Sequence, residues 1–167
     1  MPAGKMRMSV ASLMVVGLVL VTGGVWWSSR AQAKDECHQI NTTQSAVANF
    51  ANFTTAGEIK AGFLKGMTHF TGDPASLTPI RSTPAPPLKP TFSYTGDLLI
   101  TTPSGTLTTR SVGVFENGPF GRGTQLDHVI AGSGLYSGAE GFLYFNFEAD
   151  DSGAAFTSSV TGEICVH

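Results

Sequence analysis

The most regular part of the chain lies between Phe92 and the C-terminus, where strand-like segments alternate with short turns. In residues 92–102, Phe92, Tyr94, Leu98 and Ile100 share one face, a period of two that is typical of a half-buried strand. The turn at residues 103–105 predicts a hairpin partner over 106–116. Similar patterns, separated by turns rich in Gly, Asn and Asp, predict three further strands over 124–131, 141–149 and 155–166.

The preceding residues are less regular. Residues 59–70 hold two strand-like runs broken near Gly62 to Gly66, and residues 44–53 are compatible with a short helix, although the flanking threonines favour an extended chain. Residues 73–90 are rich in proline and predict a long loop, because proline has no N–H for a strand ladder. Many short strands of this kind indicate an all-β sandwich or barrel.

The first 33 residues predict a cleaved signal peptide. Lys5 and Arg7 precede an apolar stretch over 10–25, and Ala31-Gln32-Ala33 is a small-x-small cleavage site. The alternative is a retained membrane anchor, in which Trp26 and Trp27 would lie at the interface. Cleavage leaves one domain over residues 34–167, secreted or periplasmic, with no further membrane span expected.

Charge argues against one class of partner. The full chain has a formal net charge of −2, and three of its ten basic residues lie in the predicted signal. The remaining domain is therefore more acidic still. Phosphate backbones are bound by clustered Lys and Arg, so we expect no nucleic-acid partner.

The only two cysteines, Cys37 and Cys165, lie near the two ends of the predicted domain. In an exported protein an even pair predicts a disulfide. A bond between the first and last strands would fasten a sheet that closes on itself, which favours a barrel over a sandwich. Zinc or a catalytic thiol is the alternative, but His38 beside Cys37 is too little for a metal site, and no metal or cofactor is expected.

Residues 130–141, Ile-Ala-Gly-Ser-Gly-Leu-Tyr-Ser-Gly-Ala-Glu-Gly, resemble the I-x-G-G-T-G-x-[FY]-x-G-A-x-G segment of allene oxide cyclase-like and dirigent-like barrels. The match is shortened where Ser133 and Gly134 stand. Residues 92–98, 105–108, 113–115 and 161–165 also resemble strands of secreted bacterial relatives, so the resemblance covers about residues 92–166, and more weakly 57–79. It implies an eight-stranded antiparallel barrel and, from both named groups, a trimer. On physical grounds, Tyr136 in this segment could cap one barrel end with its ring.

The resemblance also suggests a chemistry. Allene oxide cyclases shape a reactive epoxide with a carboxylate and a bound water, and dirigent proteins steer quinone methides with Asp, Arg and Tyr. No position of either family is carried over to this chain. Acidic groups inside a barrel would have raised pKa values that make proton transfer useful. The candidate catalytic residues are therefore Glu148, Tyr144, Asn146, Glu116, Arg110 and Asp127, although a solvated surface charge is the simpler interpretation of each.

Two functions remain open. The first is a secreted barrel that binds a small apolar ligand or serves as a structural or interaction module. The second is a cofactor-independent cyclase or isomerase, which two or more carboxylates, or an Arg–carboxylate pair, in the lumen would favour. In residues 141–149, Leu143, Phe145 and Phe147 share one face, whereas Phe142 and Tyr144 share the other. Because both faces carry aromatic rings, we expect a homotrimer or homodimer that covers the outer face.

Overall fold

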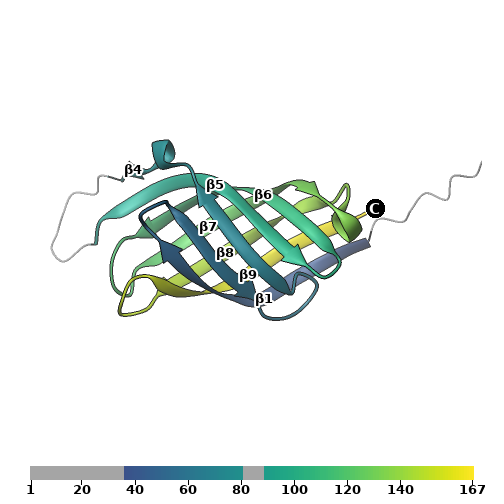
Figure 1. Ribbon diagram of the computed structural model, residues 1–167, viewed down its shortest axis with the longest axis horizontal. Coiled ribbons are helices and arrows are strands. Elements are labelled where there is room, and N and C mark those ends of the chain that lie inside the picture. The colour runs from purple at the N-terminus through teal and green to yellow at the C-terminus, as the bar shows by residue number, and fades with distance from the viewer. Residues whose placement is uncertain (1–35, 81–88) are drawn as a thin grey trace, which may run out of the picture. The chain divides into compact units, whose positions relative to one another are not determined.

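The computed structural model describes residues 36–80 and 89–167, and the predicted signal peptide lies outside this part of the chain. The described residues form nine strands and two single-turn 3₁₀ helices (Figure 1). The strands are β1 (Glu36–Asn49), β2 (Thr54–Ile59), β3 (Gly66–Gly72), β4 (Thr78–Pro79), β5 (Thr91–Thr102), β6 (Gly105–Glu116), β7 (Arg122–Gly132), β8 (Glu140–Ala149) and β9 (Ala155–Val166). The 3₁₀ helices are η1 (Pro74–Ser76) and η2 (Gly134–Tyr136).

Eight of these strands close into an antiparallel barrel. The strand order is β3-β2-β1-β9-β8-β7-β6-β5, and pairing of β3 with β5 closes the barrel. The two residues of β4 pair with Ser93 and Phe92, near the start of β5. A closed barrel leaves its paired strands without an open edge, which removes the usual site of edge-to-edge aggregation. The predicted eight-stranded antiparallel barrel is confirmed.

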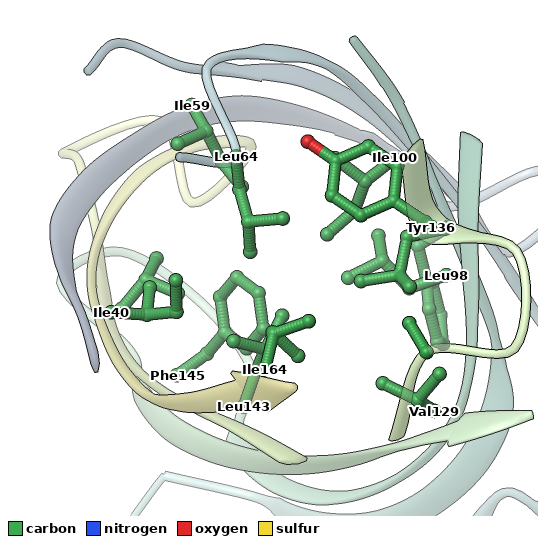
Figure 2. Close-up of a cluster of buried hydrophobic side chains, with 14 of the residues drawn as sticks. Ile40, Ile59, Leu64, Leu98, Ile100, Val129, Tyr136, Leu143, Phe145 and Ile164 are labelled. Atoms are coloured by element: carbon green, nitrogen blue, oxygen red, sulfur yellow. The ribbon is translucent and has the colours of Figure 1, made fainter. Parts of the chain in front are cut away.

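Alternating side chains fill the barrel interior. On β5, Tyr94, Leu98 and Ile100 are buried, and on β8 Leu143 and Phe145 are buried, as the period of two predicts. Figure 2 looks into this core, where aliphatic and aromatic side chains from strands and loops point toward one another. The predicted boundaries of the last five strands agree with those observed within two residues.

A disulfide joins Cys37 on β1 to Cys165 on β9, as the sequence predicts. The two cysteines lie directly opposite each other in the β1–β9 register. The bond therefore links the first and last strands of the described chain where they pair within the barrel.

Two segments differ in detail from the sequence-based expectation. Residues 44–49 continue β1 as a strand, so the short helix does not form there, because pairing with both β2 and β9 satisfies their backbone groups. The proline-rich loop holds η1 and the short β4, and the N–H of Ile80, which follows β4, donates to the Thr91 carbonyl oxygen at 2.9 Å. Within the described ranges, no helix is long and apolar enough to cross a membrane.

Candidate functional site

One end of the barrel is closed by its own side chains. Leu64, from the loop between β2 and β3, is 0% exposed, and Tyr136 of η2 is 1% exposed. The Tyr136 hydroxyl donates to the Phe63 carbonyl oxygen at 2.8 Å, and the two rings pack edge to face at 5.4 Å. His38 stacks on the Phe63 ring at a centroid distance of 3.7 Å. The prediction that Tyr136 caps a barrel end is confirmed.

The opposite end holds a cavity of about 100 Å³. Three turns surround its mouth: residues 50–53 between β1 and β2, residues 117–121 between β6 and β7, and residues 150–154 between β8 and β9. Among the described residues, Phe53 is the large loop side chain that packs onto the core at this end, and it is partly buried, whereas Leu64 is fully buried. The buried side chains that line the cavity are the polar Gln44, Tyr94, Gln125 and Ser158 and the apolar Phe70, Leu98 and Phe145.

Aromatic rings form most of the cavity wall. Tyr94 packs edge to face against Phe70 at 5.6 Å and against Phe115 at 5.7 Å, while Phe147 packs against Phe156 at 5.4 Å. Phe53 joins them from the mouth, with a φ of 55°, a backbone conformation that is uncommon for a side chain of this size. Such a wall favours an apolar, ring-containing ligand, because aromatic contacts contribute energy beyond the area they bury.

Glycines make room for these rings on the neighbouring strands. Gly113 lies opposite Tyr94 in the β5–β6 register, and Gly123 lies opposite Phe147 in the β7–β8 register. A Cβ atom at either glycine would overlap the facing ring. The ring positions in the cavity wall therefore depend on residues that carry no side chain.

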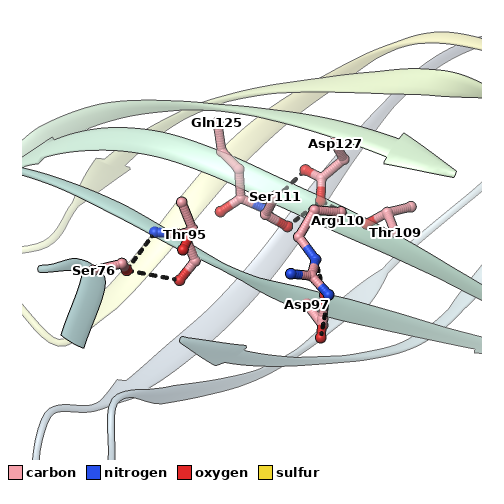
Figure 3. A network of polar contacts seen from close by, with 8 residues as sticks. All are labelled: Ser76, Thr95, Asp97, Thr109, Arg110, Ser111, Gln125 and Asp127. Carbon is pink, nitrogen blue, oxygen red and sulfur yellow. Dashed lines mark hydrogen bonds and ion pairs between the residues drawn. The ribbon is translucent and has the colours of Figure 1, made fainter. Parts of the chain in front are cut away.

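A buried polar network lies beneath the cavity, between β5, β6 and β7. Asp127 is 0% exposed and accepts hydrogen bonds from the Thr109 hydroxyl at 2.6 Å, from the Ser111 hydroxyl, and from Gln125 Nε2 at 2.8 Å. The Tyr94 hydroxyl in turn donates to Gln125 Oε1 at 2.6 Å. Figure 3 shows Thr109, Ser111, Gln125 and Asp127 gathered together, whereas Arg110 turns toward Asp97.

Burial sets the protonation behaviour of this network. Desolvation raises the pKa of Asp127, and the hydrogen bonds from Ser111, Thr109 and Gln125 oppose that shift without cancelling it. Desolvation, together with the nearby charge of Asp127, also raises the pKa of the Tyr94 hydroxyl, so this tyrosine stays protonated at any physiological pH. The network thus joins one titratable carboxyl to one neutral phenol through a single amide.

A second buried polar group faces the cavity from β1, β3 and β9. Gln44 Nε2 donates to Thr68 Oγ1 at 2.8 Å, and the Ser158 hydroxyl donates to Gln44 Oε1 at 3.4 Å. All three side chains are buried. The base of the cavity therefore combines an apolar wall with polar groups that already have partners, which is the composition of a typical small-molecule site.

The structure separates the six predicted catalytic candidates. Asp127 lies in the interior, directly below Gln125, and Glu116 lies at the mouth, where its carboxylate accepts from the Arg122 backbone N–H at 3.3 Å. The other four, Arg110, Tyr144, Asn146 and Glu148, lie on the outer face. A catalytic role for any of the six stays a prediction.

Two of the outer candidates form ion pairs across neighbouring strands. Arg110 Nε lies 2.6 Å from Asp97 Oδ1, and Glu148 Oε2 lies 3.3 Å from Arg122 Nε. Their side chains are about half exposed or more, so solvent weakens these pairs and each contributes little stability. We therefore assign these two to the barrel surface, which leaves Glu116 at the cavity mouth and Asp127 behind the cavity-lining Gln125.

The outer face of β6, β7 and β8 is apolar over one cross-strand row. Val112, Leu126 and Tyr144 lie opposite one another in register, and they are exposed by 52%, 45% and 38%. Phe142 and Ile130 lie on the same face and are also half exposed. The expectation that the outer face of β8 carries exposed rings is confirmed, whereas the partner that would cover it stays a prediction.

Sequence reasoning missed Gln125, Gln44 and Ser158 as site residues, and used Tyr94 only as a strand residue. The pairing of β6 with β7 holds the signal that could have found part of this network, because it places Ser111 opposite Asp127. Within the described part of the chain, the one cluster with metal-ligand chemistry is Cys37, Glu163 and Cys165. Its two sulfurs are consumed by the disulfide.

Comparison with solved structures finds a likeness to a pterocarpan synthase dirigent protein, GePTS1. The two share 10% sequence identity with a TM-score of 0.34, over 80% of this chain and 92% of that chain. No protein-family model matches the sequence, and no curated protein matches it either. The fold assignment given above rests on the strand pairings themselves.

Proposed function

We propose that the protein binds a small apolar ligand in the open end of the barrel. The observation that carries this proposal is the aromatic cavity with Gln44, Tyr94, Gln125 and Ser158 at its base. Its volume of about 100 Å³ is smaller than the roughly 150 Å³ of an apolar cavity that binds benzene, so a bound ring would extend from the cavity toward the mouth. The rest of a larger ligand would lie in the mouth between the three turns.

A pair of neighbouring serines allows a matched test. Ser158 is buried at the cavity base, whereas Ser159 on the same strand points outward. Ser158→Leu fills the cavity and should abolish binding of a ring-sized probe such as indole, measured by titration calorimetry. Ser159→Leu adds the same side chain on the outside and should leave the affinity unchanged. Equal affinity for indole in both variants would contradict the proposal.

A second candidate function is a cyclase or isomerase of the allene oxide cyclase or dirigent type, acting on a reactive small molecule. The observation that favours it is the buried Asp127, because burial raises the pKa of this carboxyl and so makes it a better proton donor or acceptor than an exposed one. Among the described residues, however, the buried interior holds this single carboxylate and no Arg–carboxylate pair. Ligand binding is therefore the better-supported function.

The second function has its own test. An epoxide or quinone methide probe would be converted by the wild-type protein and not by Asp127→Asn, while both proteins keep saturable binding of a neutral bicyclic ring, either indole or quinoline. Loss of conversion with retained binding would support catalysis. Equal conversion by both proteins would remove Asp127 from any catalytic role.

We also propose that the protein is exported and that a second copy covers the outer row formed by Val112, Leu126 and Tyr144. The disulfide supports export, since such bonds persist in oxidising compartments. The exposed apolar row supports self-association. Sedimentation velocity should then show a dimer or trimer that Leu126→Glu dissociates, and a wild-type monomer would overturn the second part.

A further inference from the structure

Gln125 lies between the cavity and Asp127, and the two ends of its side-chain amide make different hydrogen bonds. One end of an amide accepts hydrogen bonds and the other end donates them. The partner on one side of Gln125 therefore decides which end faces the partner on the other side. Asp127 stands on one side, and Tyr94 stands on the other.

Asp127 determines the orientation of this amide. An ionised carboxylate can only accept hydrogen bonds, and it is surrounded here by three donors: the hydroxyls of Thr109 and Ser111 and Nε2 of Gln125. Within the described residues, no other acidic or basic side chain is buried with it. The amide nitrogen of Gln125 is thus turned toward Asp127, and its oxygen is turned toward Tyr94.

The orientation of the Gln125 amide determines which hydrogen bonds the Tyr94 hydroxyl can make. Its hydroxyl has one proton, which it donates to Gln125 Oε1 at 2.6 Å. The remaining capacity of the phenol oxygen is to accept a hydrogen bond. Because Tyr94 lines the cavity, a ligand reaching this oxygen meets an acceptor rather than a donor.

We propose that ionised Asp127, acting through Gln125, fixes Tyr94 as a hydrogen-bond acceptor and so selects apolar ring ligands that carry an N–H or O–H donor. This inference rests on the proposed ligand-binding function and adds the chemical class of ligand to it. In this account Asp127 and Gln125 are positioning residues, and Tyr94 is the residue that contacts the ligand. The selection arises because a buried acceptor left without a donor loses its interaction with water and gains nothing in return.

Replacing Asp127 by asparagine, its neutral isostere, should reverse the orientation of the Gln125 amide and with it the hydrogen-bonding role of Tyr94. In Asp127→Asn, the Thr109 and Ser111 hydroxyls donate to the amide oxygen, which leaves the new NH₂ group facing Gln125. The Gln125 amide then turns over, so that its oxygen accepts from residue 127 and its nitrogen donates to the Tyr94 oxygen. The Tyr94 proton is released into the cavity, and Tyr94 becomes a donor.

Indole and quinoline form a matched pair of probes for this reversal. Indole offers an N–H donor, whereas quinoline offers a ring nitrogen that only accepts, and both are neutral bicyclic rings at pH 8. We expect wild-type protein to bind indole about three- to tenfold more tightly than quinoline, the equivalent of one neutral hydrogen bond. Asp127→Asn should prefer quinoline by a similar factor.

Two further variants serve as controls. Gln125→Met removes the amide at similar volume and frees the Tyr94 hydroxyl to rotate, so the preference should disappear. Tyr94→Phe removes the acceptor, so indole should lose its advantage while quinoline binding changes little. The proposal is overturned if Asp127→Asn keeps the wild-type preference, or if wild-type protein binds both probes with equal affinity.

A ligand-free measurement separates this inference from the proposed function. If neither probe binds wild-type protein, the proposed function fails for ring ligands, but the amide orientation is still measurable. Nuclear Overhauser effects between the Gln125 side-chain NH₂ protons and the Tyr94 ring should be weak in wild-type protein and strong in Asp127→Asn. The same pattern in both proteins would overturn the proposed orientation.

Discussion

The two ends of the barrel are built from the same strands but differ in what their loops contribute. At the closed end, the loop over residues 60–65 and η2 send Leu64 and Tyr136 into the interior. At the open end, the turns over residues 50–53, 117–121 and 150–154 surround a cavity with aromatic rings in its wall, to which the first turn adds the ring of Phe53. The strands thus provide a scaffold, and the loops decide which end can take a ligand.

Truncation of Leu64, which fills the closed end, should produce the largest difference in stability between variants at the two ends. Leu64→Ala leaves a void in a fully packed region and should lower the free energy of unfolding by about 2–5 kcal/mol. Phe147→Ala at the partly open cavity should cost less stability and should weaken indole binding instead. Urea unfolding and calorimetry measure the two effects. Equal stability losses at the two ends would contradict the proposed division of roles.

The disulfide should stabilise the fold without affecting the cavity. Its 128-residue separation strongly restricts the unfolded chain, so Cys37→Ser/Cys165→Ser should lower the free energy of unfolding by about 2–4 kcal/mol. Indole affinity at 25 °C should not change, because the bond lies at the closed end. Reduction of wild-type protein is the control and should give the same loss. A change in affinity greater than twofold would show that the two ends are coupled.

Gly113 tests the close packing of the cavity wall. Gly113→Ala places a methyl group against the Tyr94 ring and should lower the free energy of unfolding by about 1–3 kcal/mol, with weaker indole binding. Val114→Ala on the outer face of the same strand, outside the row formed by Val112, Leu126 and Tyr144, is the matched control and should change stability by less than about 0.5 kcal/mol. Thermal unfolding of both variants measures the difference, and similar effects would argue against the tight contact.

The pH dependence of stability should report on Asp127. Burial raises the pKa of this carboxyl in the folded protein above its unfolded value, so the folded state binds the proton more tightly. Its contribution to stability is therefore greatest at low pH and is lost as the pH rises from about 4 through the raised pKa. The melting temperature of wild-type protein minus that of Asp127→Asn should fall over this range. A difference that rises with pH would show that the hydrogen bonds outweigh desolvation.

The sequence predicts the barrel strands well where apolar and polar residues alternate regularly. On β5 and β8, the alternation of apolar residues in the sequence identifies the inward face, which carries Phe92, Leu98 and Ile100 on β5 and Leu143 and Phe145 on β8. The predicted turns also end these strands at the observed positions to within two residues. The sequence leaves residues 44–49 of β1 open between helix and strand, because the inward face carries Gln44 and Ala46, which give no hydrophobic period. The identity of this segment as a strand depends on pairing with β2 and β9, which is a long-range effect.

The candidate site was only partly predictable. On β7 the buried face carries Gln125, Asp127 and Val129, whereas Leu126 and Ile130 point outward, so the usual assignment of apolar residues to the interior is inverted there. Asp127 was named for its chemistry, but its partners Thr109, Ser111 and Gln125 are residue types normally found outside. Only the register between β6 and β7 shows that these polar side chains satisfy one another.

The central claim is that the open end alone accepts a small apolar ligand. Titration of ¹⁵N-labelled protein with indole tests it most directly, because each backbone amide reports on its own surroundings. We predict saturable shifts confined to residues 48–55, 115–121 and 145–158, with no change in residues 60–65 and 134–139. Shifts at the closed end, or no saturable shifts anywhere, would contradict the claim.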